Sequence, residues 1–204
     1  MALFTQSKNV ARKRRKIPDH LVYEIIDGRP FYWKGYKQTL QNEFNEVGIS
    51  GFQSVIVSLI LHQLFLNAEL VSYRILAGKP GLEINTKNIL CGDIFIYHKE
   101  ILTPGKITNK YIDIPPFIYI EVDILADIKG KDSLQYITQK TKKLLDFGTQ
   151  KVIWVLPAIQ KTLVATQVSS WQFADWSNDV EILDGQTFNI ARDLKEEGIH
   201  VEKL

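Results

Sequence analysis

The chain has 204 residues, of which 45% are hydrophobic and 24% charged, a composition that excludes a disordered protein and suits one domain with a sizeable core. Its net charge of +2 is too small to indicate a polyanionic partner by itself. The single cysteine, Cys91, cannot form an internal disulfide, and no apolar run approaches the ~18 to 20 residues of a membrane span. The N-terminus has basic residues but no apolar signal segment, so we expect a cytoplasmic protein without membrane contact.

The N-terminal segment, residues 1–17, contains a run of consecutive cationic side chains at 12–16. Such a run can contact phosphates, but a solvated, flexible tail is the commoner outcome and the one we expect. Residues 18–204 are expected to form a single domain that begins with a hairpin over 21–33, turning at Asp27-Gly28. Glu24 lies on this hairpin among apolar neighbours, a pattern that fits a site residue and a rim charge equally well.

Apolar side chains recur every three or four residues in two segments, which predicts two helices. The first spans about 51–67, with Ser50 placed to cap its start. The second follows Ser133, the expected cap, and stops at Gly148. Lys140 lies at the edge of the second apolar stripe, where a lysine usually extends its ammonium group to water.

Strands are predicted around these helices. Residues 70–76 read as short strands, a turn follows at 78–81, and a link then leads to residue 93. The Gly78-Lys79 pair in that turn lacks the rest of a phosphate-binding loop. A buried strand at 151–157 completes a parallel strand–helix–strand unit, and strands, turns and a short helix near 190–197 end the chain.

Acidic residues accompany two apolar strands. Asp93 opens the first, at 93–97, and Glu121 and Asp123 interrupt the second, at 117–123. Side chains alternate along a strand at ~3.3 Å per residue, so Glu121 and Asp123 are expected on one face, roughly 7 Å apart. Two ionised carboxylates at that spacing repel by roughly 2 kcal/mol at an effective dielectric near 20. A divalent cation, a raised carboxyl pKa, a nearby lysine or exposure to water must offset this repulsion.

The order of these residues resembles the Uma-two family, whose members are related to restriction endonucleases in the PD-(D/E)XK nuclease superfamily. The resemblance covers roughly residues 20–195 and implies an α/β fold with a restriction-endonuclease-like α/β/α core and a central mixed sheet. It is carried, in chain order, by Glu24-x-x-Asp27-Gly28, a helix, Asp93 before an apolar strand, the run from Pro116 to Val122, Lys140 eight residues before Gly148, and the strand at 152–157.

The resemblance also implies roles for individual residues. Asp93 and Glu121 would bind Mg²⁺, with Mn²⁺ as a substitute, together with the backbone carbonyl of Val122. Lys140 would orient or activate the attacking water, and Glu24 would line the same cleft. Glu24 and Asp123 are the secondary catalytic candidates. Carboxylate and carbonyl oxygens are the ligands that such hard cations prefer, whereas the scattered histidines and single cysteine offer no zinc site.

The implied activity is that of a Mg²⁺-dependent endonuclease that hydrolyses nucleic-acid phosphodiesters, with DNA expected as the partner ahead of RNA. A homodimer would suit an enzyme that cuts both strands. Asp123 stands where the superfamily usually has a lysine, and this favours the alternative of a catalytically inactive nucleic-acid-binding or assembly module on the same fold. The simplest interpretation is an α/β domain whose carboxylates lie at a hydrated strand end.

Overall fold

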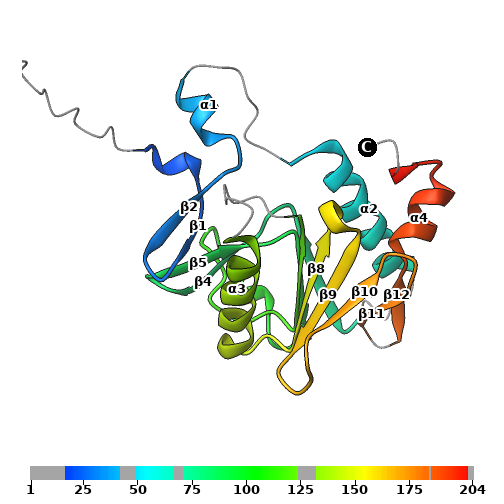
Figure 1. The fold of residues 1–204 in the computed structure, drawn as a ribbon. Coiled ribbons are helices and arrows are strands. Elements are labelled where there is room, and N and C mark those ends of the chain that lie inside the picture. The colour runs from blue at the N-terminus through cyan, green and yellow to red at the C-terminus, as the bar shows by residue number, and fades with distance from the viewer. Residues whose placement is uncertain (1–16, 42–48, 67–70, 124–131, 184, 202–204) are drawn as a thin grey trace, which may run out of the picture.

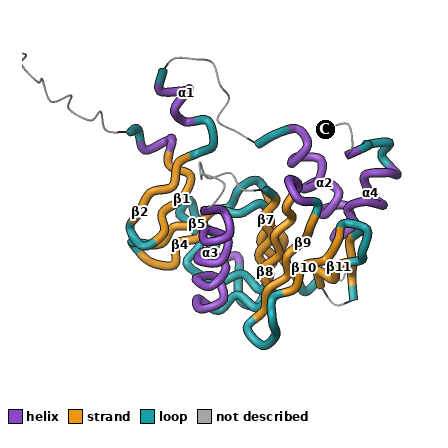
Figure 2. Tube along the Cα trace, in the orientation of Figure 1, coloured by secondary structure: helices purple, strands orange, loops and turns teal. Residues whose placement is uncertain are grey.

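The computed structural model describes residues 17–41, 49–66, 71–123, 132–183 and 185–201. In this part of the chain, helices and two separate sheets pack around a central six-stranded sheet (Figures 1 and 2). The basic run at 12–16, and with it the expected flexible tail, lies outside the described residues. None of the described helices is long and apolar enough to cross a membrane.

The central sheet is mixed, as predicted. Only β7 and β8 run parallel among its neighbouring described strands, and α3 (Ser133–Phe147) lies between them in the chain. The predicted strand–helix–strand unit is therefore confirmed. The strand order is β10-β9-β8-β7-β6-β3, with bounds β3 (Tyr73–Ala77), β6 (Ile94–His98), β7 (Ile118–Val122), β8 (Lys151–Leu156), β9 (Lys161–Thr166) and β10 (Gln172–Asp175).

A smaller antiparallel sheet lies beside the central one. It has the order β2-β1-β5-β4, with β1 (Val22–Ile26), β2 (Arg29–Tyr32), β4 (Gly81–Asn85) and β5 (Asn88–Cys91). The predicted hairpin that turns at Asp27-Gly28 is confirmed. The link expected between the turn at 78–81 and residue 93 instead contains β4 and β5, which form a second hairpin. The Asn85 side chain stabilises its turn by accepting hydrogen bonds from the Lys87 N–H and the Asn88 amide, both at 3.0 Å.

The two long helices lie where the apolar periodicity places them. At the start of α2 (Gly51–Leu66), the Ser50 hydroxyl accepts a hydrogen bond from the Gln53 N–H at 3.2 Å, so the predicted cap is confirmed. Gly148 ends α3 with φ 121°, also as predicted, but Ser133 is the first helical residue rather than the cap. The remaining described elements are α1 (Tyr36–Leu40), α4 (Ile190–Glu196), the hairpin of β11 (Val180–Leu183) and β12 (Gln186–Phe188), and single 3₁₀ turns at Asp19–Leu21, Pro104–Lys106 and Pro157–Ile159.

Two hydrophobic clusters cover the two faces of the central sheet. On one face, α3 and the smaller sheet pack against alternate residues such as Tyr119 and Trp154. On the other, α2, α4 and the β11–β12 hairpin pack against the intervening residues, including Ile120 and Ile153. All five residues of β7 are buried, which confirms the predicted burial on both faces. Glu121 has the same parity as Tyr119 and therefore faces α3 and the smaller sheet.

Candidate active site

Four of the predicted site residues meet between the smaller sheet, β7 and α3. Glu24 comes from β1, Glu121 from the end of β7, Lys140 from the middle of α3, and Asp93 from the residue before β6. The Asp93 N–H donates to the Ile120 carbonyl at 3.1 Å, which fixes Asp93 alongside Glu121. All four side chains are buried.

Lys140 is the centre of this cluster. Its Nζ lies 2.8 Å from Glu24 Oε2, 3.1 Å from Glu121 Oε2 and 2.9 Å from the Cys91 carbonyl oxygen, so each ammonium hydrogen has an acceptor. The rings of Tyr23, Tyr119, Tyr136 and Trp154 surround it, with centroids 5.3–5.6 Å from Nζ. With 0% of its side chain exposed, Lys140 does not reach water, and the expectation of an ammonium group extended to solvent is wrong.

Burial and the neighbouring charges shift the pKa of the Lys140 ammonium group in opposite directions. Burial alone would lower the pKa of Lys140, but the charges of Glu121 and Glu24 raise the pKa above its usual value. Lys140 is therefore held as an ammonium ion. Burial raises the pKa of Glu24 despite Lys140, and the Tyr136 hydroxyl donates a short hydrogen bond to this carboxylate.

Glu121 has the most hydrogen-bonding partners of the three carboxylates in the cluster, and the described partners are protein groups. It accepts hydrogen bonds from the Tyr23 hydroxyl at 2.6 Å and the Tyr119 hydroxyl at 2.8 Å, in addition to its contact with Lys140. Burial would raise its pKa, but the positive charges of Lys140 and Lys79 and the two hydroxyls together lower the pKa below its usual value. Glu121 is thus kept ionised and fixed in orientation.

Asp93 is held against the main chain of Val122. Its Oδ2 accepts the Val122 N–H at 2.8 Å, and the Gln53 amide of α2 donates to the Val122 carbonyl at 2.6 Å and approaches Asp93 Oδ2 at 3.3 Å. Burial, followed by the charge of Glu121, raises the pKa of Asp93. Gln53 was missed in the sequence, where its only signal is an amide at the apolar spacing of Ile56 and Ile60.

Lys79 is the second residue that sequence analysis missed. Its Nζ lies 2.8 Å from Asp93 Oδ1 and 3.3 Å from Glu121 Oε1, between the two predicted metal ligands. Its side chain is 11% exposed, so this lysine, unlike Lys140, reaches the surface. In the sequence, Gly78-Lys79 is only a fragment of a phosphate-binding loop, and no neighbouring residue indicates that the turn at 78–81 lies over the carboxylates.

The expected continuation of the second acidic strand through Asp123 is wrong. The strand β7 ends at Val122, and Asp123 has a left-handed backbone with φ 65°. Its N–H donates to the Val155 carbonyl at 2.8 Å, and the residue is half-buried. Alternation therefore does not place Asp123 on the face of Glu121, and its catalytic role stays a prediction.

Glycine at position 92 leaves space for the ring that supports Glu121. A Cβ added to Gly92 would lie 2.5 Å from Tyr119 Cζ and 2.7 Å from its hydroxyl oxygen, closer than real side chains approach. The same hydroxyl also contacts the Cys91 carbonyl, so its single hydrogen is shared between that carbonyl and Glu121. Any larger residue here would displace Tyr119 from Glu121.

The groups around Asp93 and Glu121 are oxygen donors of the kind that divalent cations prefer. An ammonium group already lies between Asp93 and Glu121, so a positive charge is sterically and electrostatically accommodated there. Within the described residues, no three acidic, histidine or cysteine side chains converge on a single point. A cation held here would have two carboxylates, the Val122 carbonyl once released by Gln53, and water, a set that fits Mg²⁺ or Mn²⁺.

The fold was compared with those of known proteins. A crystal structure from Anabaena variabilis, of a protein described as a putative nuclease belonging to DUF820, matches 84% of this chain and 89% of its own with a TM-score of 0.58. The two chains share one nuclease-like fold. Their sequences are only 17% identical, so the match supports the nuclease-like fold and does not establish the resemblance to the Uma-two family. No family model matches the sequence, and neither does any curated protein.

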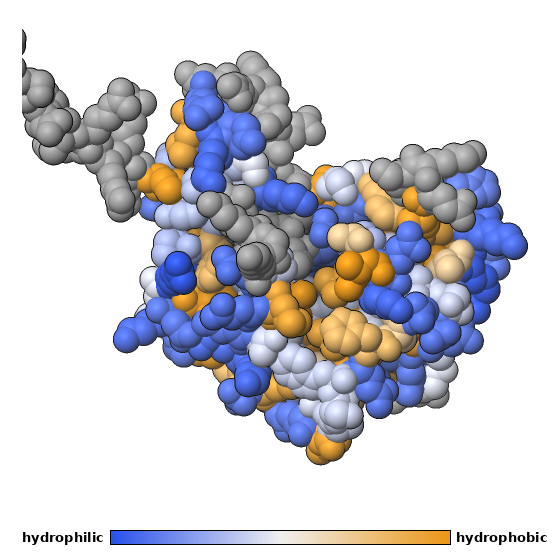
Figure 3. Space-filling model, in the orientation of Figure 1, coloured by the Kyte–Doolittle hydropathy of each residue, from blue (hydrophilic) through white to orange (hydrophobic). Residues whose placement is uncertain are grey.

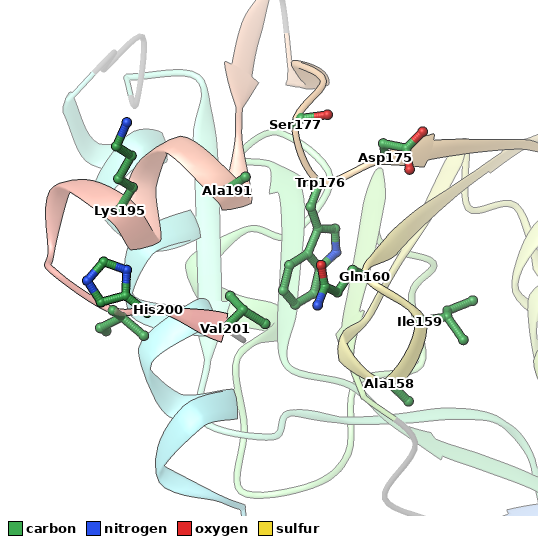
Figure 4. A pocket seen from close by; sticks show the side chains of 11 residues that line it. Ala158, Ile159, Gln160, Asp175, Trp176, Ser177, Ala191, Lys195, His200 and Val201 are labelled. Atoms are coloured by element: carbon green, nitrogen blue, oxygen red, sulfur yellow. The ribbon is translucent and has the colours of Figure 1, made fainter. Parts of the chain in front are cut away.

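A hollow of about 690 Å³ lies elsewhere, between the end of β10, the turn before β9 and α4 (Figure 4). Trp176 and Gln160 lie together in it, and Lys195 and His200 come from the α4 side. None of the carboxylates or lysines of the cluster is among its described lining residues. On the face shown in Figure 3, hydrophobic surface lies in separate areas between hydrophilic side chains rather than in one continuous patch.

Proposed function

We propose that this protein is a metal-dependent nuclease that hydrolyses phosphodiester bonds, with DNA as its substrate. The observation that carries the proposal is the pair Asp93 and Glu121, whose carboxylates both contact the Lys79 ammonium group. Lys140 contacts the other carboxylate oxygen of Glu121. The nuclease-like fold supports the same reading, since the structural neighbour is described as a putative nuclease.

In this proposal, Asp93, Glu121 and the Val122 carbonyl would hold Mg²⁺ or Mn²⁺. The bound cation would polarise the scissile phosphate and lower the pKa of a coordinated water. Tyr23 and Tyr119 orient Glu121 through their hydroxyls, so this carboxylate need not reorganise when it binds a cation.

Lys140 contributes its charge. Its ammonium keeps Glu121 ionised and adds positive potential beside the position where the attacking water and the developing negative charge would lie. Glu24 contacts Lys140 at 2.8 Å and so acts as a positioning residue for its ammonium group.

The test combines cation binding with cleavage. Mn²⁺ binding by calorimetry and nicking of supercoiled plasmid, with single-stranded DNA and RNA as parallel substrates, are measured for the wild type, Glu121→Gln, Asp93→Asn and the matched surface control Asp175→Asn. Asp175 is exposed and pairs only with Lys161 among the described contacts. Loss of both binding and cleavage in the two cluster variants, with the control unchanged, is expected. Equal cleavage by Glu121→Gln and the wild type would refute the proposal.

A non-catalytic nucleic-acid-binding module is the second candidate. It is favoured by the complete burial of Lys140, whose three hydrogens are all taken by protein acceptors, as in a structural ion cluster. In that case DNA would bind without a divalent cation, its affinity would fall steeply with salt, and no cleavage would follow. The same plasmid assay and a binding titration at two salt concentrations separate the candidates.

A further inference from the structure

Lys79 occupies an unusual backbone position for a lysine. It follows Gly78, which has φ 92°, and has φ 63° itself, a left-handed conformation that residues with a Cβ seldom adopt. Glycine would fit this position without steric strain. The lysine side chain therefore offers something that offsets the strain, and its contacts with Asp93 and Glu121 are the evident gain.

The main chain around Lys79 is anchored. The Pro80 carbonyl accepts the Gly92 N–H at 3.4 Å, and the Gly81 carbonyl accepts the Ile112 N–H at 3.1 Å. The ring of Tyr111 packs so closely on Gly81 that an added Cβ would lie 2.2 Å from its Cδ1. The four rotatable bonds of the Lys79 side chain allow its ammonium group to move while the neighbouring main chain stays in place.

The charges of the cluster favour an exchange of cations. With the three carboxylates of Glu24, Asp93 and Glu121 ionised, Lys140 and Lys79 leave one negative charge unbalanced. A divalent cation added beside Lys79 would make the cluster positive, whereas one that replaces it would make the cluster neutral. The distances also favour replacement of the Lys79 ammonium group over addition beside it, since Lys79 Nζ already occupies the space between Asp93 Oδ1 and Glu121 Oε1.

We propose that Lys79 is the resident counter-ion of the metal site, which fills the cation position until a divalent cation displaces its ammonium toward the surface. The inference rests on the proposed cation site and adds to it a residue that sets the affinity of that site. Because the side chain already reaches the surface, the displaced ammonium would lie there, beside the cation site, where a nucleic-acid phosphate would approach.

The experiment measures cation affinity rather than activity. Mn²⁺ binding by calorimetry and thermal unfolding with and without Mn²⁺ are recorded for the wild type, Lys79→Met, Lys79→Arg and Lys143→Met. Lys79→Met removes the competing charge and is expected to bind Mn²⁺ at least about tenfold more tightly, a change of about 1.4 kcal/mol. Its metal-free form is expected to melt at a lower temperature, because Asp93 and Glu121 lose a counter-ion. Lys143→Met is the matched control, since Lys143 pairs with Asp27 outside the cluster.

Each outcome decides a separate question. Tighter binding by Lys79→Met, with Lys79→Arg and Lys143→Met at the wild-type affinity, supports the exchange. Equal or weaker binding by a folded Lys79→Met, when the wild type binds Mn²⁺, refutes the role of Lys79 and leaves the proposed function intact. Absence of Mn²⁺ binding in every variant refutes the metal site and the exchange together. If Lys79→Met fails to fold, Lys79→Gln, which keeps a polar head without charge, takes its place.

Discussion

Replacing Lys140 by methionine should destabilise the protein severely, because the change removes the charge that two buried carboxylates share. Methionine has a similar length and is accommodated by the four aromatic rings around Nζ, so the loss is electrostatic rather than steric. Glu24 and Glu121 would stay buried without their ammonium partner. Breaking a buried ion pair in this way costs about 3–5 kcal/mol.

The magnitude is large enough to measure in two ways. For a chain of this length, each kcal/mol shifts the melting temperature by about 2–4 °C, so the Lys140→Met variant should melt roughly 6–20 °C below the wild type. Urea unfolding followed by far-UV circular dichroism gives the free energy directly. Tryptophan fluorescence is a useful second probe because the Trp154 ring centroid lies 5.4 Å from Lys140 Nζ.

Two further variants separate the buried pair from a general effect of losing a lysine. Lys143→Met changes the same helix, but its partner Asp27 is exposed, so the cost should be much smaller than that of Lys140→Met. Combining Lys140→Met with Glu24→Gln should recover part of the loss, since one uncompensated charge is removed. If Lys140→Met proves as stable as Lys143→Met, the reasoning about a charged, buried lysine is wrong.

Three other predictions concern residues around the site. Thr141→Val should cost about 1–3 kcal/mol in urea unfolding, since the Thr141 hydroxyl accepts a 2.9 Å hydrogen bond from the buried Trp154 indole. The control Thr162→Val removes a buried hydroxyl that has no hydrogen-bond partner among the described residues, so it should be neutral or stabilising. Burial raises the pKa of the Cys91 thiol to about 11, so at pH 8 the native thiol should react with a disulfide reagent roughly 100-fold more slowly than the urea-unfolded chain, and equal rates would contradict this. A hydrogen bond from Lys143 lowers the pKa of the exposed Asp27, so the stabilisation by this carboxylate is present above its unfolded pKa and is lost as the pH falls through its folded pKa. The melting-temperature difference between wild type and Asp27→Asn should therefore shrink as the pH is lowered through that range, and a difference that grows on acidification would contradict this.

Much of the fold could be predicted because its signals are local. The Asp27-Gly28 turn, the Ser50 cap and the Gly148 stop each depend on a few neighbouring residues, and the structure has all three. The hairpin of β4 and β5 was missed because each strand is short and its turn depends on Asn85 rather than on an Asn-Gly or Asp-Gly pair.

In the candidate site, too, the residues with a signal in the sequence could be predicted and those brought in by tertiary contacts could not. Asp93 and Glu121 could be found because carboxylates in apolar strands stand out, and Lys140 through its place in the order of family residues. Lys79 and Gln53 could not, because nothing local to a turn or a helix shows that distant segments meet there. Lys79 is 42 residues from Glu121 in the chain, and Gln53 is 69 from Val122. Tertiary contacts of this kind depend on how the two sheets and α2 pack together.

The placement of lysine on α3 follows from the end of β7. A lysine two residues after Glu121 would share its face only if the strand continued, and the left-handed backbone at Asp123 ends the alternation at that position. Glu121 pairs with Trp154 across the parallel β7–β8 register, and the Trp154 indole donates to Thr141 of α3. That contact holds the neighbouring Lys140 over the end of β7, so its ammonium reaches Glu121 from the helix instead of along the strand. Strand alternation therefore does not assign position 123 to the face of Glu121, and the positive partner of Glu121 comes from the helix.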